Sequence, residues 1–391
     1  MTVWDRVELG RVAKIVRSSV SPDELSPETP YLGLEHLQRG GRIIGSSTVA
    51  AEGLLSSKFE FGSGDILYGK LRPYLAKISA PDFSGVCSTD ILPVRPGANL
   101  DSRYLLHWLR QPSMIKFASV RANGANLPRL APNELARFSI PLPPLVEQKR
   151  IAAVLDQVDT LRVKRCEAIT LLDDLVQSVF LEMFGNPATN PKGWPLGAVG
   201  EILESATYGT SEKASQSGDV PVLRMGNVTS TGEIDMADLK YLAVRQVSEK
   251  CMVRYGDVLF NRTNSAELVG KSAIYRRDES VAYAGYLVRL RVNEENSPEY
   301  LAAYLNSAYA KAWFRAKCKS IVGMANINAK EVQAMRLAVP PLELQLKFAE
   351  SVKAIESAKQ AHRFHLATLD ELFESVQQRA FAGQLWDYEA A

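Results

Sequence analysis

Four segments of the chain combine basic and amide side chains with glycine or proline, a composition suited to loops that contact nucleic acid. In the first half they are residues 68–74 (YGKLRPY) and 121–129 (RANGANLPR), and in the second half 261–265 (NRTNS) and 323–328 (GMANIN). Arginine and lysine pair with guanine edges, and asparagine pairs with adenine edges. The predicted nucleic-acid contacts are Lys70, Arg72, Arg121, Asn123, Asn126, Arg129, Arg262, Asn264, Lys271, Lys319, Asn326 and Asn328.

Each segment taken alone is also typical of an ordinary turn, because Asn and Gly favour turns for conformational reasons. For any single residue the turn is the simpler interpretation. The binding interpretation gains support because such segments occur at matching places in both halves of the chain.

The two halves are related by an internal repeat. Residues 173–179 (DDLVQSV) recur as 370–376 (DELFESV), displaced by 197 positions, and 64–67 (GDIL) is matched by 256–259 (GDVL). Solenoid repeats have roughly 20–50 residues. A displacement this long therefore predicts two whole lobes, each followed by the same kind of helix.

A long helix is predicted after each lobe. Proline-rich runs at 140–144 and 339–341 end an extended segment, because proline restrains the preceding residue from helical angles. Apolar residues then recur every seven positions over about five heptads, which is typical of a coiled coil in helices of about 38 residues. The predicted pairing residues are Ile151, Val154, Val158, Leu161, Arg165, Leu172, Leu175 and Val179 in the first helix, and Phe348, Ile355, His362, Leu369, Leu372 and Val376 in the second.

Both predicted seams become polar at their midpoint, where Arg165 precedes His362 by the repeat displacement of 197. A polar seam position costs stability and can specify register. His362 and His365 could instead be a pair of metal ligands on one helical face, but no third ligand lies nearby in the sequence. We therefore predict no metal site.

The lobes are predicted to be α+β. Runs at 64–68, 90–94 and 286–292 indicate strands, and 104–117 and 298–317 indicate amphipathic helices. The expected architecture is two tandem lobes separated and followed by long helices. The predicted boundaries are 1–144 for the first lobe, 145–185 for the central helix, 186–341 for the second lobe, 342–385 for the C-terminal helix and 386–391 for a tail.

Composition restricts the class of protein. With 391 residues, 46% hydrophobic and 23% charged, the chain is expected to be a globular protein of two or more domains. The four cysteines form no Cys-x-x-Cys pair, and no apolar stretch approaches a membrane span, so we expect a cytoplasmic protein.

The net charge of +2 is unevenly distributed. Residues 1–144 carry 17 Lys and Arg against 13 Asp and Glu, and residues 186–341 carry 19 against 16. The helical segments 145–185 and 342–391 carry 5 against 7 and 5 against 8. Basic lobes suit a polyanion, although excesses this small also occur on surfaces that bind nothing.

The sequence lacks the motifs of a catalyst that acts on DNA bases. It contains no Asn-Pro-Pro-aromatic or Asp-Pro-Pro-Tyr motif to hold a flipped base, and no Asp-x-Gly-x-Gly cofactor loop. The glycines at 62–64 lack the strand–helix context of a nucleotide-binding loop. We predict no catalytic residue and no cofactor.

Three motifs resemble one known family. Residues 142–151 (LPPLVEQKRI), 64–73 (GDILYGKLRP) and 180–187 (FLEMFGNP) are similar to the signatures of specificity (S) subunits, HsdS, of type I restriction–modification enzymes. The resemblance covers essentially the whole chain. The second half departs from it at 343–345 (ELQ) and at 261–264 (NRTN). The resemblance implies from the second departure that the two halves of the chain recognise different half-sites.

The resemblance implies two target-recognition domains, each reading one half of a split sequence in double-stranded DNA. It also implies that the helices pack antiparallel and set the spacing, that two methyltransferase (M) subunits dock on the chain, and that restriction (R) subunits complete a cleaving enzyme. No membrane partner is implied.

Other classes remain open at this stage. The nearest alternative is the recognition subunit of a methylation-only or other two-part modification system. A coiled-coil scaffold without DNA function would keep the helices but would not need the two sets of loops, and a self-contained nuclease or methylase would need motifs that the sequence lacks. The target bases and the spacer length do not follow from the sequence.

Overall fold

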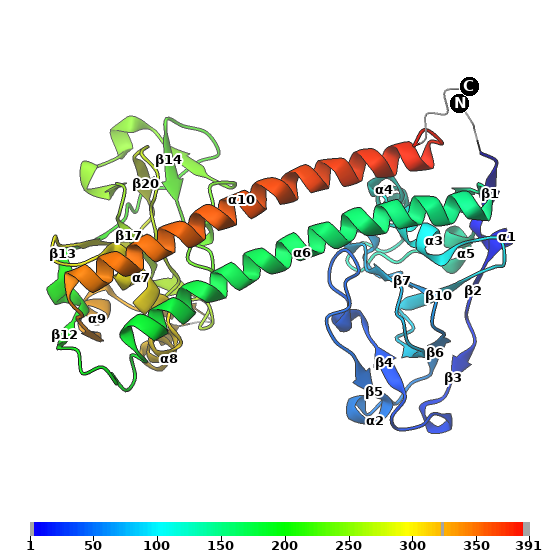
Figure 1. The fold of residues 1–391 in the computed structure, drawn as a ribbon, viewed down its shortest axis with the longest axis horizontal. Coiled ribbons are helices and arrows are strands. Elements are labelled where there is room, and N and C mark those ends of the chain that lie inside the picture. Colours follow the sequence, from blue (N-terminus) through cyan, green and yellow to red (C-terminus); the bar gives the residue numbers. More distant parts are fainter. Residues whose placement is uncertain (1–3, 322–323, 386–391) are drawn as a thin grey trace. The chain divides into compact units, whose positions relative to one another are not determined.

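The chain forms two compact units, each built around one lobe. The computed structural model describes residues 4–321 and 324–385, with the backbone alone at 319–321 and 324. Unit 1 comprises Met1–Lys164 with His365–Ala391, and unit 2 comprises Arg165–Phe364. Two long helices, α6 (Leu145–Phe184) and α10 (Leu342–Phe381), each contribute one part to each unit (Figure 1). Helices and strands are interspersed in both units, so the predicted α+β class is confirmed.

Unit 1 contains two sheets and a short two-stranded ladder. The first sheet is antiparallel, in the order β2 (Ala13–Ile15), β10 (Ile91–Pro96), β7 (Ile66–Gly69) and β8 (Ile78–Ser79). The second sheet has the order β3 (Ser19–Val20), β6 (Lys58–Phe61), β9 (Gly85–Cys87), β4 (Pro30–Leu32) and β5 (Ser47–Thr48), with β4 and β9 parallel. The ladder pairs β1 (Arg6–Glu8) with β11 (Ser139–Pro141), the strand that leads into α6.

Unit 2 repeats the first sheet and the ladder, and its second sheet has four strands in place of five. Its antiparallel sheet has the order β13 (Leu203–Tyr208), β21 (Leu287–Val292), β17 (Val258–Asn261) and β19 (Ser272–Ile274). Its second sheet has the order β15 (Lys240–Leu242), β14 (Val220–Leu223), β20 (Val281–Tyr283) and β16 (Met252–Val253), again with one parallel pair, β14 and β20. The ladder before α10 pairs β12 (Leu196–Ala198) with β24 (Arg336–Ala338). A further small sheet contains β18 (Thr263–Asn264), β23 (Met324–Asn326) and β22 (Lys319–Ile321).

The helical segments expected at 104–117 and 298–317 are each two helices. In unit 1, α3 (Ser102–Leu109) ends before Pro112, which occupies the first turn of α4 (Pro112–Arg121). In unit 2, α7 (Pro298–Asn306) ends at Ser307, whose side chain caps α8 (Ala308–Lys317). Proline has no amide hydrogen to continue a helix, and serine is a preferred N-cap, so both breaks have local causes. The remaining short helices are α1 (Leu9–Val12), α2 (Val49–Glu52), α5 (Pro132–Ala136) and α9 (Ala329–Gln333).

A buried glutamine joins each long helix to its lobe in the same way. The side chain of Gln148 accepts a hydrogen bond from the Asp101 backbone at 2.8 Å, and that of Gln345 accepts one from the Ser297 backbone at 2.9 Å. Asp101 and Ser297 are the N-caps of α3 and α7. Both glutamines are completely buried. The internal repeat of the sequence is therefore also a repeat of contacts.

Within each unit the two long helices run antiparallel. In unit 1, Arg162 of α6 pairs with Asp370 of α10. In unit 2, Phe180 packs against Phe348 with ring centroids 5.8 Å apart. Also in unit 2, Asp173 of α6 pairs with Lys359 of α10, so partner numbers fall in α10 as they rise in α6, which is the signature of antiparallel helices.

The predicted pairing residues differ widely in burial. The buried ones are Ile151, Val158, Phe348 and Ile355; the partly buried ones are Val154, Arg165, Leu172, Val179, His362, Leu369 and Val376; and the exposed ones are Leu161, Leu175 and Leu372. Burial is concentrated where the helices also pack against a lobe: Leu155 and Ala152, which the heptad pattern omits, lie in the core with α3. At the predicted polar midpoint, Arg165 and His362 contact each other, with NH1 and Nδ1 3.2 Å apart.

No helix in the described part of the chain is both long enough and apolar enough to cross a membrane. Among the same residues, no group of three or more His, Cys, Asp or Glu side chains is arranged to hold a metal ion.

Candidate nucleic-acid interface

The two predicted contact segments of the first lobe lie side by side. The strand β7 leads directly into residues 70–74, and this loop is hydrogen-bonded to the segment that follows α4. The Arg72 amide donates to the Pro128 carbonyl at 2.7 Å, and the Leu130 amide donates to the Lys70 carbonyl at 2.9 Å. The structure therefore unites segments about 50 residues apart in the sequence into one surface, which we call loop pair 1 (residues 68–74 and 121–130).

One carboxylate organises two of the basic side chains in loop pair 1. Asp90 Oδ1 lies 3.1 Å from Arg129 Nε and 3.8 Å from Lys70 Nζ. Two cations sharing one carboxylate leave a net positive charge at this place. Such an arrangement positions the cations while preserving their attraction for an anion.

Arg72 has a strained backbone and an exposed side chain. Its φ of 52° lies in the left-handed region, which non-glycine residues rarely adopt. Its side chain makes no hydrogen bond or ion pair with the residues that the structure describes. A strained residue that contributes no side-chain bond to the fold is a good candidate for an external contact.

The other candidates of loop pair 1 are also at the surface. The guanidinium of Arg121 stacks on the Phe117 ring, 3.4 Å from its centroid. Asn123 pairs with Arg129 through both backbone hydrogen bonds, at 3.0 and 2.8 Å, and its side chain is exposed, as is that of Asn126. The loop thus presents planar guanidinium and amide groups on a hydrogen-bonded backbone.

The equivalent segments of the second lobe also pair. Strand β18 is antiparallel to β23, with Thr263 opposite Asn326, and the Ile327 amide donates to the Arg262 carbonyl at 2.9 Å. We call residues 261–265 with 324–328 loop pair 2. Both lobes therefore bring their two predicted contact segments together, at corresponding places after β7 and β17.

Arg262 is held at the centre of loop pair 2. Its NH2 donates to the side-chain oxygen of Asn326 at 3.0 Å, and its guanidinium lies 4.9 Å from the centroid of the Tyr208 ring. Its Nε is buried and has no hydrogen-bond partner in the described part of the chain. The guanidinium therefore retains an unused donor.

Several second-lobe candidates have structural roles. Asn328 caps α9 by accepting a hydrogen bond from the Glu331 amide at 2.9 Å, and Asn264 accepts one from the Ser265 amide at 2.9 Å. Lys271 donates to the Met225 carbonyl at 3.3 Å, and burial lowers the pKa of its ammonium group. Lys319 lies in β22, but its side chain is outside the described residues. The second lobe therefore offers fewer uncommitted side chains than the first.

One exposed tyrosine lies in loop pair 1 and two lie beside loop pair 2, and none was among the predicted contacts. Tyr74 follows Arg72 by two residues and is 47% exposed. Tyr208 lies next to Arg262, and the carbonyl of the exposed Tyr286 accepts a hydrogen bond from the Arg262 amide at 3.1 Å. Tyr74 could have been found from the sequence, since it ends the first basic segment. Tyr208 and Tyr286 are distant from loop pair 2 in the sequence and lie beside it only because of strand pairing.

A family comparison accounts for both halves of the chain. The model of the type I restriction modification DNA specificity domain matches residues 1–170 and again residues 191–365.

Curated relatives include specificity subunits of type I restriction enzymes from Escherichia coli. The EcoDI subunit is 30% identical over 48% of this chain and 42% of its own length, and the EcoKI subunit is 26% identical over 75% of this chain and 67% of its own length. The match thus spans less than half of the first relative and about two thirds of the second.

Two solved structures share the fold. One comes from work on the assembly and conformational transition of the type I restriction–modification system, with a TM-score of 0.57, 22% identity and coverage of 98% of this chain and 99% of that one. The other is the S subunit of the type I system of M. genitalium, with a TM-score of 0.58, 15% identity and coverage of 97% and 96%.

Proposed function

Because the chain belongs to the type I restriction modification DNA specificity family, we propose that it selects the DNA sequence on which a type I restriction–modification complex acts. In this proposal each lobe reads one half of a bipartite target in double-stranded DNA. The lobes differ in their loop sequences, so the half-sites differ as well.

The observation that carries this proposal is the pairing of the predicted contact segments in both lobes. Loop pair 1 joins Lys70 and Arg72 to Asn123 and Arg129, and loop pair 2 joins Arg262 to the segment around Asn326. Arginine and asparagine can each make two parallel hydrogen bonds to a base edge in the major groove. Neighbouring tyrosines add flat apolar surface suited to sugar or base contacts.

The modest charge of the lobes supports a need for partners. Phosphate contacts dominate affinity for DNA, and lobes with net charges of only +4 and +3 offer few of them. We propose that two methyltransferase subunits dock on the chain and complete the grip on DNA, with restriction subunits joining the full complex. The chain itself would contribute recognition and no catalysis.

The long helices are proposed to set the spacing of the half-sites and to receive the methyltransferase subunits. None of the residues 159–179 of α6 is buried. Leu171 is 68% exposed there, and Val163 and Leu175 are also exposed. Large apolar side chains left at the surface are typical of protein–protein contacts.

The direct test is to express the chain with a cognate methyltransferase and map methylated adenines across the host genome. A single bipartite motif with a fixed spacer is expected, and it should disappear when the chain is omitted. Adding the restriction subunit should then produce cleavage of unmethylated DNA. Methylation that persists without the chain, or a continuous motif read by one lobe alone, would contradict the proposal. Methylation that is not followed by cleavage when the restriction subunit is added would place the chain in a modification-only system.

Gel-shift titration provides a second test. The chain with its methyltransferase partner should bind target duplex more tightly than the chain alone, because the partner supplies additional phosphate contacts. Equal affinity in the two cases would show that the lobes are sufficient.

A further inference from the structure

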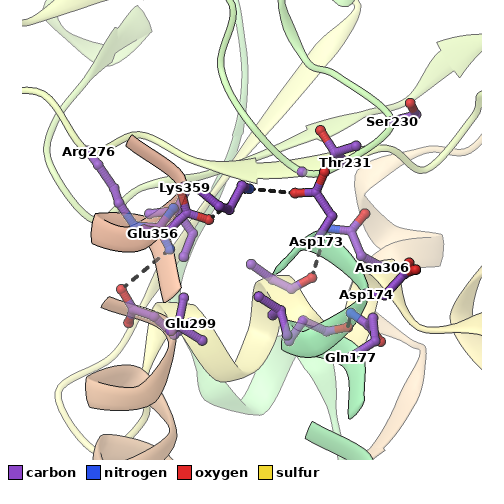
Figure 2. Close-up of a pocket in the computed structure, with 16 residues that line it drawn as sticks. Asp173, Asp174, Gln177, Ser230, Thr231, Arg276, Glu299, Asn306, Glu356 and Lys359 are labelled. Atoms are coloured by element: carbon purple, nitrogen blue, oxygen red, sulfur yellow. Dashed lines mark hydrogen bonds and ion pairs between the residues drawn. The ribbon is translucent and has the colours of Figure 1, made fainter. Parts of the chain in front are cut away.

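Each unit contains a cavity where its lobe packs against the two long helices. The unit 1 cavity has a volume of about 790 Å³ and is lined by parts of α3, α6 and α10 with residues 39–43 and 76–80. The unit 2 cavity, of about 230 Å³, is lined by parts of α6, α7 and α10 with residues 230–232 (Figure 2). The larger cavity has the size of a site for a small molecule.

The two cavities occupy equivalent places in the internal repeat. The hydroxyl groups of Tyr104 in α3 and Tyr300 in α7 both donate to a carbonyl of the strand before the long helix, that of Pro141 or Ala338. This correspondence aligns the cavity-lining residues of the two helices. Arg103, His107 and Arg110 of α3 match Glu299, Ala303 and Asn306 of α7.

The equivalent cavities have opposite charge. The unit 1 cavity is lined by five arginines and three carboxylates, and the unit 2 cavity by two basic residues and four carboxylates. In Figure 2 the basic residues Lys359 and Arg276 are drawn paired with Asp173 and Glu299. The small cavity is therefore lined by an excess of carboxylates. The large cavity is lined by an excess of basic side chains, of which Arg103 and Arg162 are paired with Asp156 and Asp370.

Arg110 is the clearest uncompensated cation in the unit 1 cavity. Its guanidinium donates to the Ile78 carbonyl at 2.7 and 2.9 Å and to the Gly41 carbonyl at 3.3 Å, and it makes no ion pair with a described carboxylate. Burial lowers the pKa of this guanidinium. Its hydrogen bonds are to carbonyl groups, and the nearby carboxylates of Asp159 and Asp156 oppose the lowering of its pKa without outweighing it, so a bound anion would offset more of its desolvation.

His107 also lines the cavity and has an unused polar atom. Its side chain is 1% exposed, and its Nε2 lies 2.7 Å from Asp156 Oδ1. Its Nδ1 is buried without a hydrogen-bond partner in the described part of the chain. Arg39, at the cavity rim, is exposed and makes no ion pair with the described residues. Three groups therefore remain able to bind a ligand: Arg39, His107 and Arg110.

We propose that the unit 1 cavity binds a phosphate-bearing anion through Arg110 and Arg39, with His107 as an additional polar contact. Arg39 can present the planar pair of donors that matches two phosphate oxygens. Arg110 retains its NH1 group as a donor, because its Nε and NH2 are bonded to the Ile78 and Gly41 carbonyls. The proposal does not depend on DNA recognition by the lobes. The unit 2 cavity, with Asn306 in place of Arg110, is the internal counterpart that does not bind this ligand.

The cavity wall is continuous with loop pair 1. Ala76 and Ser79, which line it, follow the loop that contains Lys70 and Arg72. The Gly40 amide donates to the Leu75 carbonyl at 3.0 Å, so the 39–43 turn is tied to the same segment. An anion bridging Arg39 and Arg110 would therefore restrain the base of this loop.

Calorimetric titration of the full chain with inorganic phosphate, pyrophosphate and a nucleoside monophosphate tests the proposal at constant ionic strength. At least one of them should bind with 1:1 stoichiometry, and the unphosphorylated nucleoside should not. Arg110→Gln should weaken binding by about tenfold or more, since charge-assisted hydrogen bonds are lost. Arg39→Gln, at an exposed position, should weaken it by a smaller factor, and Arg276→Gln in the unit 2 cavity should leave it unchanged.

Each possible result of these titrations leads to a different conclusion about the unit 1 cavity. Absence of binding by all three phosphates at millimolar concentration would overturn the proposal, as would equal weakening by Arg110→Gln and Arg276→Gln. If Arg110→Gln does not fold, Arg39→Gln decides, because its side chain makes no internal bond. A duplex competitor identifies the source of the phosphate: displacement of the bound small anion indicates a DNA backbone phosphate, and simultaneous binding indicates a free metabolite.

Discussion

Arg162 and Lys359 are separated by the repeat displacement of 197 residues and make the same contact in the two units. Arg162 Nε lies 2.6 Å from Asp370 Oδ1 on the opposite helix, and Lys359 Nζ lies 2.5 Å from Asp173 Oδ1. Asp173 and Asp370 are themselves repeat equivalents. Each unit therefore has a basic residue at this repeat position that forms an ion pair between its antiparallel helices.

The two bridges differ in burial and in their further partners. The Arg162 side chain is 30% exposed and lies over the Phe373 ring, whereas the Lys359 side chain is 2% exposed. Lys359 also pairs with Glu356 of its own helix and with Glu233 of the second lobe. The second bridge thus fixes the lobe to the helices as well as the helices to each other.

Removing Lys359 should therefore destabilise unit 2 strongly. Lys359→Ala leaves Asp173, Glu233 and Glu356 without their buried cation, and breaking a buried ion pair costs about 3–5 kcal/mol. Arg162→Ala, the matched control in unit 1, should cost only about 0–1 kcal/mol, as expected of a partly exposed pair. Hydrogen exchange measured on peptides of each unit should show faster exchange in unit 2 for Lys359→Ala. Similar effects of the two substitutions would show that burial does not distinguish them.

The contribution of the Glu233 ion pairs to stability should depend on pH. Burial acts to raise the pKa of this carboxyl, but its bonds to Arg363 and Lys359 outweigh burial, so the pKa lies below its ordinary value. A depressed pKa in the folded state contributes stability above the unfolded pKa of about 4.3, and this contribution is lost as pH falls through the folded value. The stability difference between wild type and Glu233→Gln should therefore be full at pH 7 and shrink below about pH 4. Urea unfolding of both proteins at several pH values measures this difference in the free energy of unfolding. A difference that does not change with pH would show that the ionised carboxylate is not responsible for it.

The loop pairs should act on separate half-sites if the proposed function is right. Arg72→Ala should weaken or relax recognition of one half-site by about 1–3 kcal/mol for a lost base-edge contact, and Arg262→Ala should act on the other. Arg11→Ala removes the same charge at an exposed position outside the loop pairs and should reduce binding only slightly. Competition binding with duplexes altered in one half-site at a time resolves these effects. Equal loss at both half-sites would mark the arginines as determinants of folding.

The helices should determine the spacer length. Deleting residues 166–172 and 363–369 together removes one heptad from each helix and preserves the seam phase, while shortening each helix by about 10 Å. This corresponds to about three base pairs, so the variant should prefer a shorter spacer between unchanged half-sites. The deletion also removes Arg363, which pairs with Glu233, and Arg363→Ala controls for that loss. The measurement is the affinity of the variant for a series of duplexes that differ only in spacer length. Retained binding with an unchanged spacer preference would refute the role of the helices.

The sequence alone determined the internal repeat, the α+β class and the existence of two long helices with apolar residues at seven-residue spacing. These features depend on local signals that recur: proline-rich runs before α6 and α10, apolar residues such as Ile151 and Phe348 at heptad spacing, and motifs displaced by 197 positions. Residue types and matching places in the repeat also predicted the four contact segments, which stay predictions. Chemistry that depends on residue type and near neighbours can be read without coordinates.

Tertiary structure decided which of these residues are buried, paired or available. Leu161 and Leu175 follow the heptad pattern but are exposed, because burial on the long helices depends on packing against the lobes as well as on the partner helix. Asn328, like Asn123, is predicted from the sequence to contact nucleic acid, yet its side chain caps α9. Lys359, which is not among the predicted pairing residues, is buried because carboxylates from a helix and a lobe distant in sequence converge on it. Such convergence is a property of three-dimensional packing, and periodicity along the chain does not encode it.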